Sequence, residues 1–233
     1  MNYIYGAFSD IGNVRPNNED SFFAGQCSTE VPIYIGIVCD GIGGLKNGEI
    51  ASGAITAHIS RWAAELSPDV TFEQATMSFL DQIYSVNKKI CGYCKVNSIE
   101  TGSTMSAVII SEDKFMAANV GDSRIYHISD DVVQITEDDV VAAKGEKRSA
   151  LRQCVGFNEK MFVNTYYGKL VKNESILICS DGFYKHMDSK RIIKKCSSIR
   201  RYSNISRVIK KEIERLKRVG ERDNITAYII KNI

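Results

Sequence analysis

The hydrophobic positions of the chain fall into short runs and into longer stretches with helical spacing. The short runs contain many β-branched and aromatic residues and are bounded by turn residues, which is typical of strands. These predicted strands cover residues 3–9, 21–25, 33–39, 104–110, 114–120, 123–128, 132–135, 162–170, 176–179 and 225–230. The run 33–39 is apolar and predicts a buried strand.

Four longer stretches have apolar residues at the i, i+3, i+4 spacing of a helix with one buried side. They cover residues 49–66, 71 to about 92, 188 or 189 to 196, and 203–219. Thr71 and Gln74 fit a capping box at the start of the second helix, and Gly220 fits a stop after the last one. Residues 136–156 are polar, and their pattern predicts no definite helix or strand. A helical turn at residues 149–155 is one interpretation.

The order of these elements predicts the fold class. Residues 104–110, 114–120 and 123–128 are separated by short turns, so we expect consecutive antiparallel strands. Two helices follow the third strand and two precede the last strand, without an internal repeat or a linker. We therefore expect one layered α+β domain that spans residues 1–233.

The composition bears on the cellular compartment of the protein. No apolar run reaches the roughly 18 residues of a membrane span, and the N-terminus lacks a basic start followed by an apolar core. The seven cysteines are scattered, and the one CxxC pair, Cys91 and Cys94, lacks a second pair at zinc spacing. We expect a cytoplasmic protein without a membrane anchor.

Charge is distributed unevenly along the chain. Residues 190–222 hold 13 Lys and Arg against 3 Glu, although the whole chain has a net charge of only +2. A basic segment of this kind could dock an acidic partner or a nucleic acid. Solvated faces of two helices explain it better, and no aromatic residues interleave the charges, so we expect no nucleic-acid binding.

Carboxylates at the ends of predicted strands are the candidate site residues. Asp40 ends the buried run and precedes Gly41-Ile42-Gly43-Gly44, where the glycines let the backbone approach a bound group closely. Asp181 repeats this arrangement after residues 176–179, and Asp20 and Asp223 stand just before strands. Taken alone, a glycine-rich turn capped by aspartate explains Asp40 equally well.

Acidic groups that converge raise one another's pKa unless a cation neutralises them. Oxygen ligands suit Mg²⁺ or Mn²⁺, and no His or Cys stands at zinc spacing. Two such ions roughly 3.5–4 Å apart could share a carboxylate and a hydroxide that attacks phosphorus in line. Arg15 would then hold a phosphate monoester, with an ion pair to Glu19 or Asp20 as the competing role.

Six motifs in a fixed order carry a resemblance that covers nearly the whole chain. They are Arg15-x-x-Asn18-Glu19-Asp20, Asp40-Gly41-x-Gly43-Gly44, Gly102-Ser103-Thr104, Asn119-Val120-Gly121-Asp122-Ser123-Arg124, Ser180-Asp181-Gly182 and Asp223-Asn224-Ile225-Thr226. Together they resemble the metal-dependent Ser/Thr protein phosphatases of type 2C, in particular the bacterial-type members. The resemblance implies a four-layer α-β-β-α sandwich of two mostly antiparallel sheets, with a dinuclear Mn²⁺ or Mg²⁺ site at one edge.

The same resemblance implies roles for individual residues. Asp40 resembles the carboxylate that bridges both ions, and the Gly41 carbonyl resembles a ligand of one of them. Asp181 and Asp223 are similar to ligands of the other ion, and Arg15 is similar to the phosphate-binding arginine. The remaining matches are Glu19 and Asp20, which contact metals or their waters, Asp122, a ligand of a weak third ion, and Asn224, which supports Asp223.

Two features depart from the family pattern. Some members have a histidine, proposed as a general acid, where this chain has Ile42, so we expect a metal-bound water to protonate the leaving group. Family members usually carry an extended flap, and the corresponding region of about residues 136–156 is short. The truncated flap puts the third ion and flap-dependent substrate selection in question.

The functional expectation is a phosphoprotein phosphatase that hydrolyses phosphoserine and phosphothreonine in signalling. Its partner would be a phosphorylated protein, such as the target of a Ser/Thr kinase, and we expect a monomer. The alternative is a weakly active or inactive binding module with the same fold, which docks an acidic partner through its basic C-terminal helices.

Overall fold

The computed structural model describes residues 2–42, 47–141 and 150–233. Its strands are β1 (Tyr3–Asp10), β2 (Asp20–Gln26), β3 (Ile33–Asp40), β4 (Met105–Ser111), β5 (Lys114–Val120), β6 (Arg124–Ile128), β7 (Val132–Gln134), β8 (Val140–Val141), β9 (Ala150–Leu151), β10 (Asn164–Lys169), β11 (Ser175–Cys179) and β12 (Ile225–Asn232). Its helices are α1 (Gly48–Ala64), α2 (Phe72–Asn97), α3 (Asp181–Tyr184), α4 (Ser189–Ser198) and α5 (Tyr202–Arg218).

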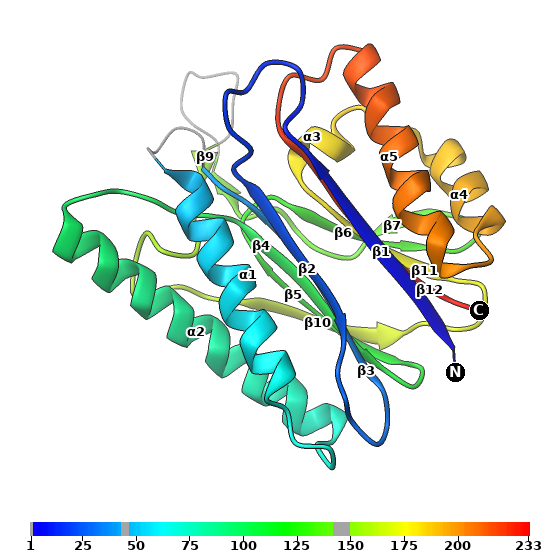
Figure 1. Cartoon of the computed structure of the whole chain (residues 1–233), viewed down its shortest axis with the longest axis horizontal. Coiled ribbons are helices and arrows are strands. Elements are labelled where there is room, and N and C mark those ends of the chain that lie inside the picture. Colours follow the sequence, from blue (N-terminus) through cyan, green and yellow to red (C-terminus); the bar gives the residue numbers. More distant parts are fainter. Residues whose placement is uncertain (1, 43–46, 142–149) are drawn as a thin grey trace.

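Two antiparallel sheets form the centre of the molecule. One has the strand order β1-β12-β11-β6-β7 and the other β10-β5-β4-β3-β2. Helices α1 and α2 cover the second sheet, and α4 and α5 cover the first (Figure 1). The predicted fold class, an α-β-β-α sandwich, is confirmed.

The apolar run of β3 is buried on both faces of its sheet, which explains its composition. Ile35 and Ile37 point to the core under α1 and α2, whereas Tyr34 and Val38 point to the core between the sheets. Side chains alternate along a strand, so a strand covered on both faces needs apolar residues throughout. Gly36 provides space for the Tyr228 ring of β12, because a Cβ atom there would lie 2.2 Å from a ring carbon.

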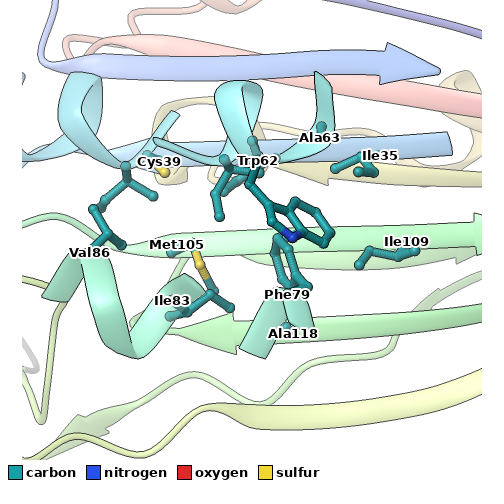
Figure 2. Packing of buried hydrophobic residues seen from close by; sticks show 14 of the residues in the cluster. Ile35, Cys39, Trp62, Ala63, Phe79, Ile83, Val86, Met105, Ile109 and Ala118 are labelled. Carbon is teal, nitrogen blue, oxygen red and sulfur yellow. The ribbon is translucent and has the colours of Figure 1, made fainter. Parts of the chain in front are cut away.

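The core under α1 and α2 is centred on an aromatic pair. The rings of Trp62 and Phe79 are 5.5 Å apart between centroids, and Ile83 and Ile109 lie beside them (Figure 2). The predicted capping box starts α2, with Gln74 N donating to Thr71 Oγ1 and Thr71 N donating to Gln74 Oε1. In the described ranges no helix is both long and apolar enough to cross a bilayer.

The basic C-terminal segment forms the outer layer over the other sheet. Ile192 and Cys196 of α4 and Ile205, Ile209 and Ile213 of α5 face the sheet. The charged residues lie mostly on the opposite side, as expected for solvated helix faces.

Four local features differ from the sequence-based expectations. Helix α2 runs five residues past Gly92, to Asn97, and ends at Ser98 with φ 53°. The strand 124–128 pairs with β11 in the other sheet and is not the third strand of a meander with β4 and β5. Residues 150–151 pair with 140–141 as β9 and β8, so the helical turn considered for residues 149–155 is wrong; residue 149 lies outside the described part. Helix α3 was not predicted.

Candidate active site

The topology brings the predicted site residues to one end of the two sheets. Asp20 begins β2 and Asp40 ends β3, and the two residues are opposite each other in the antiparallel register. Asp181 follows β11, and Asp223 precedes β12, the antiparallel neighbour of β11. Figure 1 shows the β1–β2 loop, α3 and the beginning of α1 at this same end. Four carboxylates from both sheets therefore meet at one edge.

Ser180 connects the two sheets beneath these carboxylates. Its hydroxyl donates to Asp20 Oδ2 at 2.9 Å and accepts from Thr226 N at 3.0 Å. Asp20 is 8% exposed, and burial raises its pKa to about 7, although hydrogen bonds from Thr226 and Ser180 oppose this and the charges of Asp181 and Asp223 add to it. The site thus holds a carboxylate that is costly to keep charged without a nearby cation.

Asp40 is fixed through its backbone. Its N–H donates to Thr104 Oγ1 at 3.0 Å, and its carbonyl accepts from Thr104 N at 2.9 Å and from Ser103 Oγ at 3.0 Å. The pKa of the Asp40 carboxyl is raised well above its usual value, first by burial and then by Asp20 and Asp181. Within the residues that the structure describes, the Asp40 side chain forms no ion pair and is available to a cation.

The backbone of Gly41 lies against two other segments of the site. Gly41 N donates to Glu19 O at 3.1 Å, and a Cβ atom on Gly41 would lie 2.6 Å from both Glu19 O and Gly48 O. Only glycine fits this position, so the backbone after Asp40 can lie directly against Glu19 and Gly48. Gly43 and Gly44 of the same motif lie outside the described residues.

Asp223 and Asp181 each carry a basic partner. Arg15 Nη2 donates to Asp223 Oδ2 at 2.8 Å, and Lys185 Nζ donates to Asp181 Oδ2 at 2.5 Å. The two aspartates are brought close by Gly182, where an added Cβ atom would lie 2.2 Å from Asn224 O and 3.4 Å from the Asp223 Cβ.

Asn224 holds the β1–β2 loop, residues 11–19, against the site. Its Nδ2 donates to Ile11 O and Asn17 O at 2.9 and 3.0 Å, and its Oδ1 accepts from Glu19 N at 2.9 Å. Asn224 N donates to Asp223 Oδ1. One asparagine thereby positions the loop that carries Arg15 relative to Asp223.

Glu19 faces the start of α1. Its Oε1 accepts from Gly48 N at 3.3 Å, and its carbonyl accepts from Ser52 Oγ at 2.6 Å. Burial raises the pKa of Glu19, while the bond from Gly48 lowers it. Glu19 therefore lies at the margin of the carboxylate cluster.

Asp122 stands at the corner between β5 and β6. Burial raises its pKa to about 6, with further increases from Asp181 and Asp138 and an opposing effect from Lys185. The predicted flap begins next to this corner: Asp139 N donates to Gly121 O, and Gln153 Nε2 donates to Asp139 Oδ2. The centre of the flap, residues 142–149, lies outside the described residues.

The donor set fits a divalent cation by its chemistry and by its unsatisfied oxygens. Asp20 Oδ1 and Asp181 Oδ1 are buried and have no hydrogen-bond partner within the described residues. Buried carboxylate oxygens without a donor are expected to face a cation. Among those same residues, no three His, Cys, Asp or Glu side chains are gathered tightly enough to enclose one ion by themselves. Backbone carbonyls and water would complete the coordination of Mg²⁺ or Mn²⁺.

Three residues of the site had no role in the sequence-based interpretation. Thr104 and Ser180 fall inside the recognised motifs, but their bonds to Asp40 and Asp20 depend on which strands pair. Lys185 lies four residues after Asp181, at the C-terminal cap of α3, and i, i+4 spacing could have indicated the ion pair.

Comparison with known proteins supports the interpretation of the site. The model of the family described as Protein phosphatase 2C matches residues 14–221. The chain belongs to the protein phosphatase 2C family. The family predicted from the motifs is thereby confirmed, and members of this family depend in general on Mn²⁺ or Mg²⁺.

Relatives of the phosphatase come from several bacteria. It is 28% identical to a serine/threonine phosphatase stp of Listeria innocua, over 96% of this chain and 93% of the relative. The solved structure of a Streptococcus agalactiae serine/threonine phosphatase has a TM-score of 0.85 at 22% identity and covers 100% of both chains. Staphylococcus aureus Stp1 has a TM-score of 0.79 at 24% identity, over 98% of this chain and 94% of that one. The two structures support the fold.

Proposed function

We propose that the phosphatase hydrolyses phosphoserine and phosphothreonine esters of a protein substrate at the carboxylate cluster. The observation that carries the proposal is the set of aspartates from both sheets beside the guanidinium of Arg15. Two of these aspartates have buried oxygens that lack a donor among the residues the structure describes. Family membership supplies the reaction class, and the names of the relatives support serine and threonine as the esterified residues. Residues 1–233 would act as a single catalytic domain.

The proposed metal ligands follow from the placement of the carboxylates. Asp40 ends β3 opposite Asp20, and the charges of both Asp20 and Asp181 raise its pKa, so Asp40 would contact both ions, with Gly41 O as a neighbouring ligand. Asp181 and Asp223 would hold one ion, while Asp20 and Glu19 would contact the ions or their waters. Bound Mn²⁺ or Mg²⁺ would supply an activated water for in-line attack and would neutralise phosphoryl charge.

Arg15 would orient the phosphate. Its side chain is 37% exposed, and its guanidinium has further N–H donors beyond the one that bonds Asp223. A fork of parallel N–H groups matches two oxygens of a phosphate monoester. Asp223 and Asn224 would keep this fork in place, and fixed attack geometry contributes much of the rate in such reactions.

The leaving alcohol would take its proton from water. Ile42 stands where some family members have a histidine, and its N–H donates to Gly102 O at 3.0 Å, so this position supplies no acid. The alternative of an inactive binding module is not favoured, because none of the expected carboxylates is missing from the sequence. We further propose a monomer that acts in the cytoplasm on the target of a Ser/Thr kinase.

The test is hydrolysis of a phosphopeptide with and without Mn²⁺. We expect turnover that EDTA abolishes and that Asp40→Asn lowers by at least about 1000-fold, since electrostatic stabilisation is the largest catalytic contribution in such sites. Asp113→Asn, which changes an aspartate paired with Lys169 outside the cluster, is the matched control and should retain full activity. Equal activity of the parent and Asp40→Asn, or turnover that survives EDTA, would overturn the proposal.

A further inference from the structure

Lys185 is a cation that the chain itself places in the carboxylate cluster. Asp181 is the first residue of α3, and Lys185 follows one turn later, with its N–H donating to Asp181 O at 3.1 Å. Its ammonium group lies 2.5 Å from Asp181 Oδ2. The exposed fractions of the two side chains are 47% for Lys185 and 20% for Asp181, so the contact is at the mouth of the site.

The two oxygens of Asp181 have different surroundings. Oδ2 is bonded by Lys185, while Oδ1 is buried and, in the part of the chain that the structure describes, has no hydrogen-bond donor. One oxygen is therefore available to an ion inside the cluster while the other keeps the lysine. Lysine and a metal ion can occupy Asp181 at the same time.

The charge of Lys185 also acts on a second carboxylate, that of Asp122. The charge of Lys185 lowers the pKa of Asp122, which burial and the charge of Asp181 otherwise raise to about 6. Asp122 and Asp181 are thus two carboxylates that repel each other and share one nearby ammonium group. A divalent ion between them would have to displace this ammonium or accept its repulsion.

We propose that Lys185 serves as a fixed cation in place of a third metal ion between Asp181 and Asp122, so that the phosphatase binds two divalent ions and not three. This inference rests on the proposed function, because it assumes that the cluster holds ions. Before substrate binds, two divalent ions together with Arg15 and Lys185 balance the formal charge of Glu19, Asp20, Asp40, Asp122, Asp181 and Asp223. A tethered ammonium costs no binding from solution, so the site would not depend on a weakly held ion.

A surface ion pair without function is the competing explanation, since exposed pairs at i, i+4 contribute only a few tenths of a kcal/mol. The two explanations differ in metal stoichiometry. The experiment is a Mn²⁺ titration followed by calorimetry and native mass spectrometry, with the parent, Lys185→Ala and Lys185→Gln. Lys169→Ala, which removes a lysine paired with Asp113 at 2.8 Å outside the cluster, is the matched control.

We expect two ions on the parent and on the control variant Lys169→Ala, and a third, weaker ion on both Lys185→Ala and Lys185→Gln. Adding Asp122→Asn to Lys185→Ala should return the stoichiometry to two, because the new ion would lose a ligand. Three ions on the parent, or two ions on both Lys185 variants, would overturn the role of Lys185 and leave the proposed function standing. A parent that binds no Mn²⁺ would overturn both.

Discussion

At the scale of single residues, Arg15 is the group whose role is most open to a direct test. It pairs with Asp223 at 2.8 Å, and the sequence alone allowed an ion pair with Glu19 or Asp20 as its whole role. If Arg15 binds the phosphate, Arg15→Ala should lower kcat/KM for a phosphopeptide by about 10- to 100-fold, the loss expected for hydrogen bonds to a charged group. Arg15→Lys should recover only part of it, because an ammonium lacks the planar fork.

Steady-state kinetics at saturating Mn²⁺ would measure this effect. Arg61→Ala is the matched control, since Arg61 is an exposed arginine in the last turn of α1, whose first turn lies at the site. Parent-like kcat/KM in Arg15→Ala would show that Arg15 does not bind the substrate and serves only to pair Asp223.

The candidate site could be predicted from sequence as far as its carboxylates and Arg15, but not Lys185. Asp40 is the last residue of one buried strand and Asp181 comes two residues after another, so their position at strand ends was visible in the pattern. The hydroxyls that bond Asp40 and Asp20 could not be predicted. Ser180 reaches Asp20 only because the two sheets pack together, and the two residues are 160 positions apart in the sequence. Local patterns carry no information about such contacts.

At the scale of elements, periodicity predicted most helices and strands but not every partner or end. Helix α2 continues through Gly92, where nothing lies within 4 Å of an added Cβ atom, so this glycine occupies an ordinary helical position and does not end the helix. The strand 124–128 lies in the other sheet, beside β11. The sequence did not predict this, because an apolar alternation does not specify which strand a segment pairs with. Helix α3 has only four residues, too few to show a period.

The contact between α4 and α5 rests on a buried carboxylate. Glu212 is 1% exposed and lies 2.5 Å from Lys195 and Arg215 and 3.2 Å from Arg191. Burial acts to raise the pKa of Glu212, but hydrogen bonds from Lys195 and Arg215 outweigh it and hold the pKa below 4.5. The network therefore stabilises the folded state above the unfolded pKa, and this contribution is lost as pH falls through the lowered folded value.

We expect Glu212→Gln to lower the free energy of unfolding by about 3 kcal/mol at neutral pH, because three cations lose their buried partner. The difference from the parent should shrink as the pH falls through the lowered pKa of Glu212, where the parent carboxylate becomes protonated. Urea unfolding at several pH values would measure both effects. Glu214→Gln, an exposed neighbour on α5, should change stability by less than about 0.5 kcal/mol. A pH-independent difference would show that the charge of Glu212 is not what stabilises the contact.

At the scale of the whole molecule, the proposed metal site joins the two sheets. Asp20 and Asp40 belong to one sheet, while Asp181 and Asp223 adjoin the other, so ions bound between them should oppose separation of the sheets. Mn²⁺ at about 100 times its Kd should add about 2.7 kcal/mol and raise Tm by about 5–10 °C. Calorimetry with Mn²⁺ or with EDTA measures the shift, and Asp223→Asn should remove most of it while Asp113→Asn keeps it. An equal shift in Asp223→Asn would mean that Mn²⁺ stabilises the fold from somewhere other than the junction of the sheets.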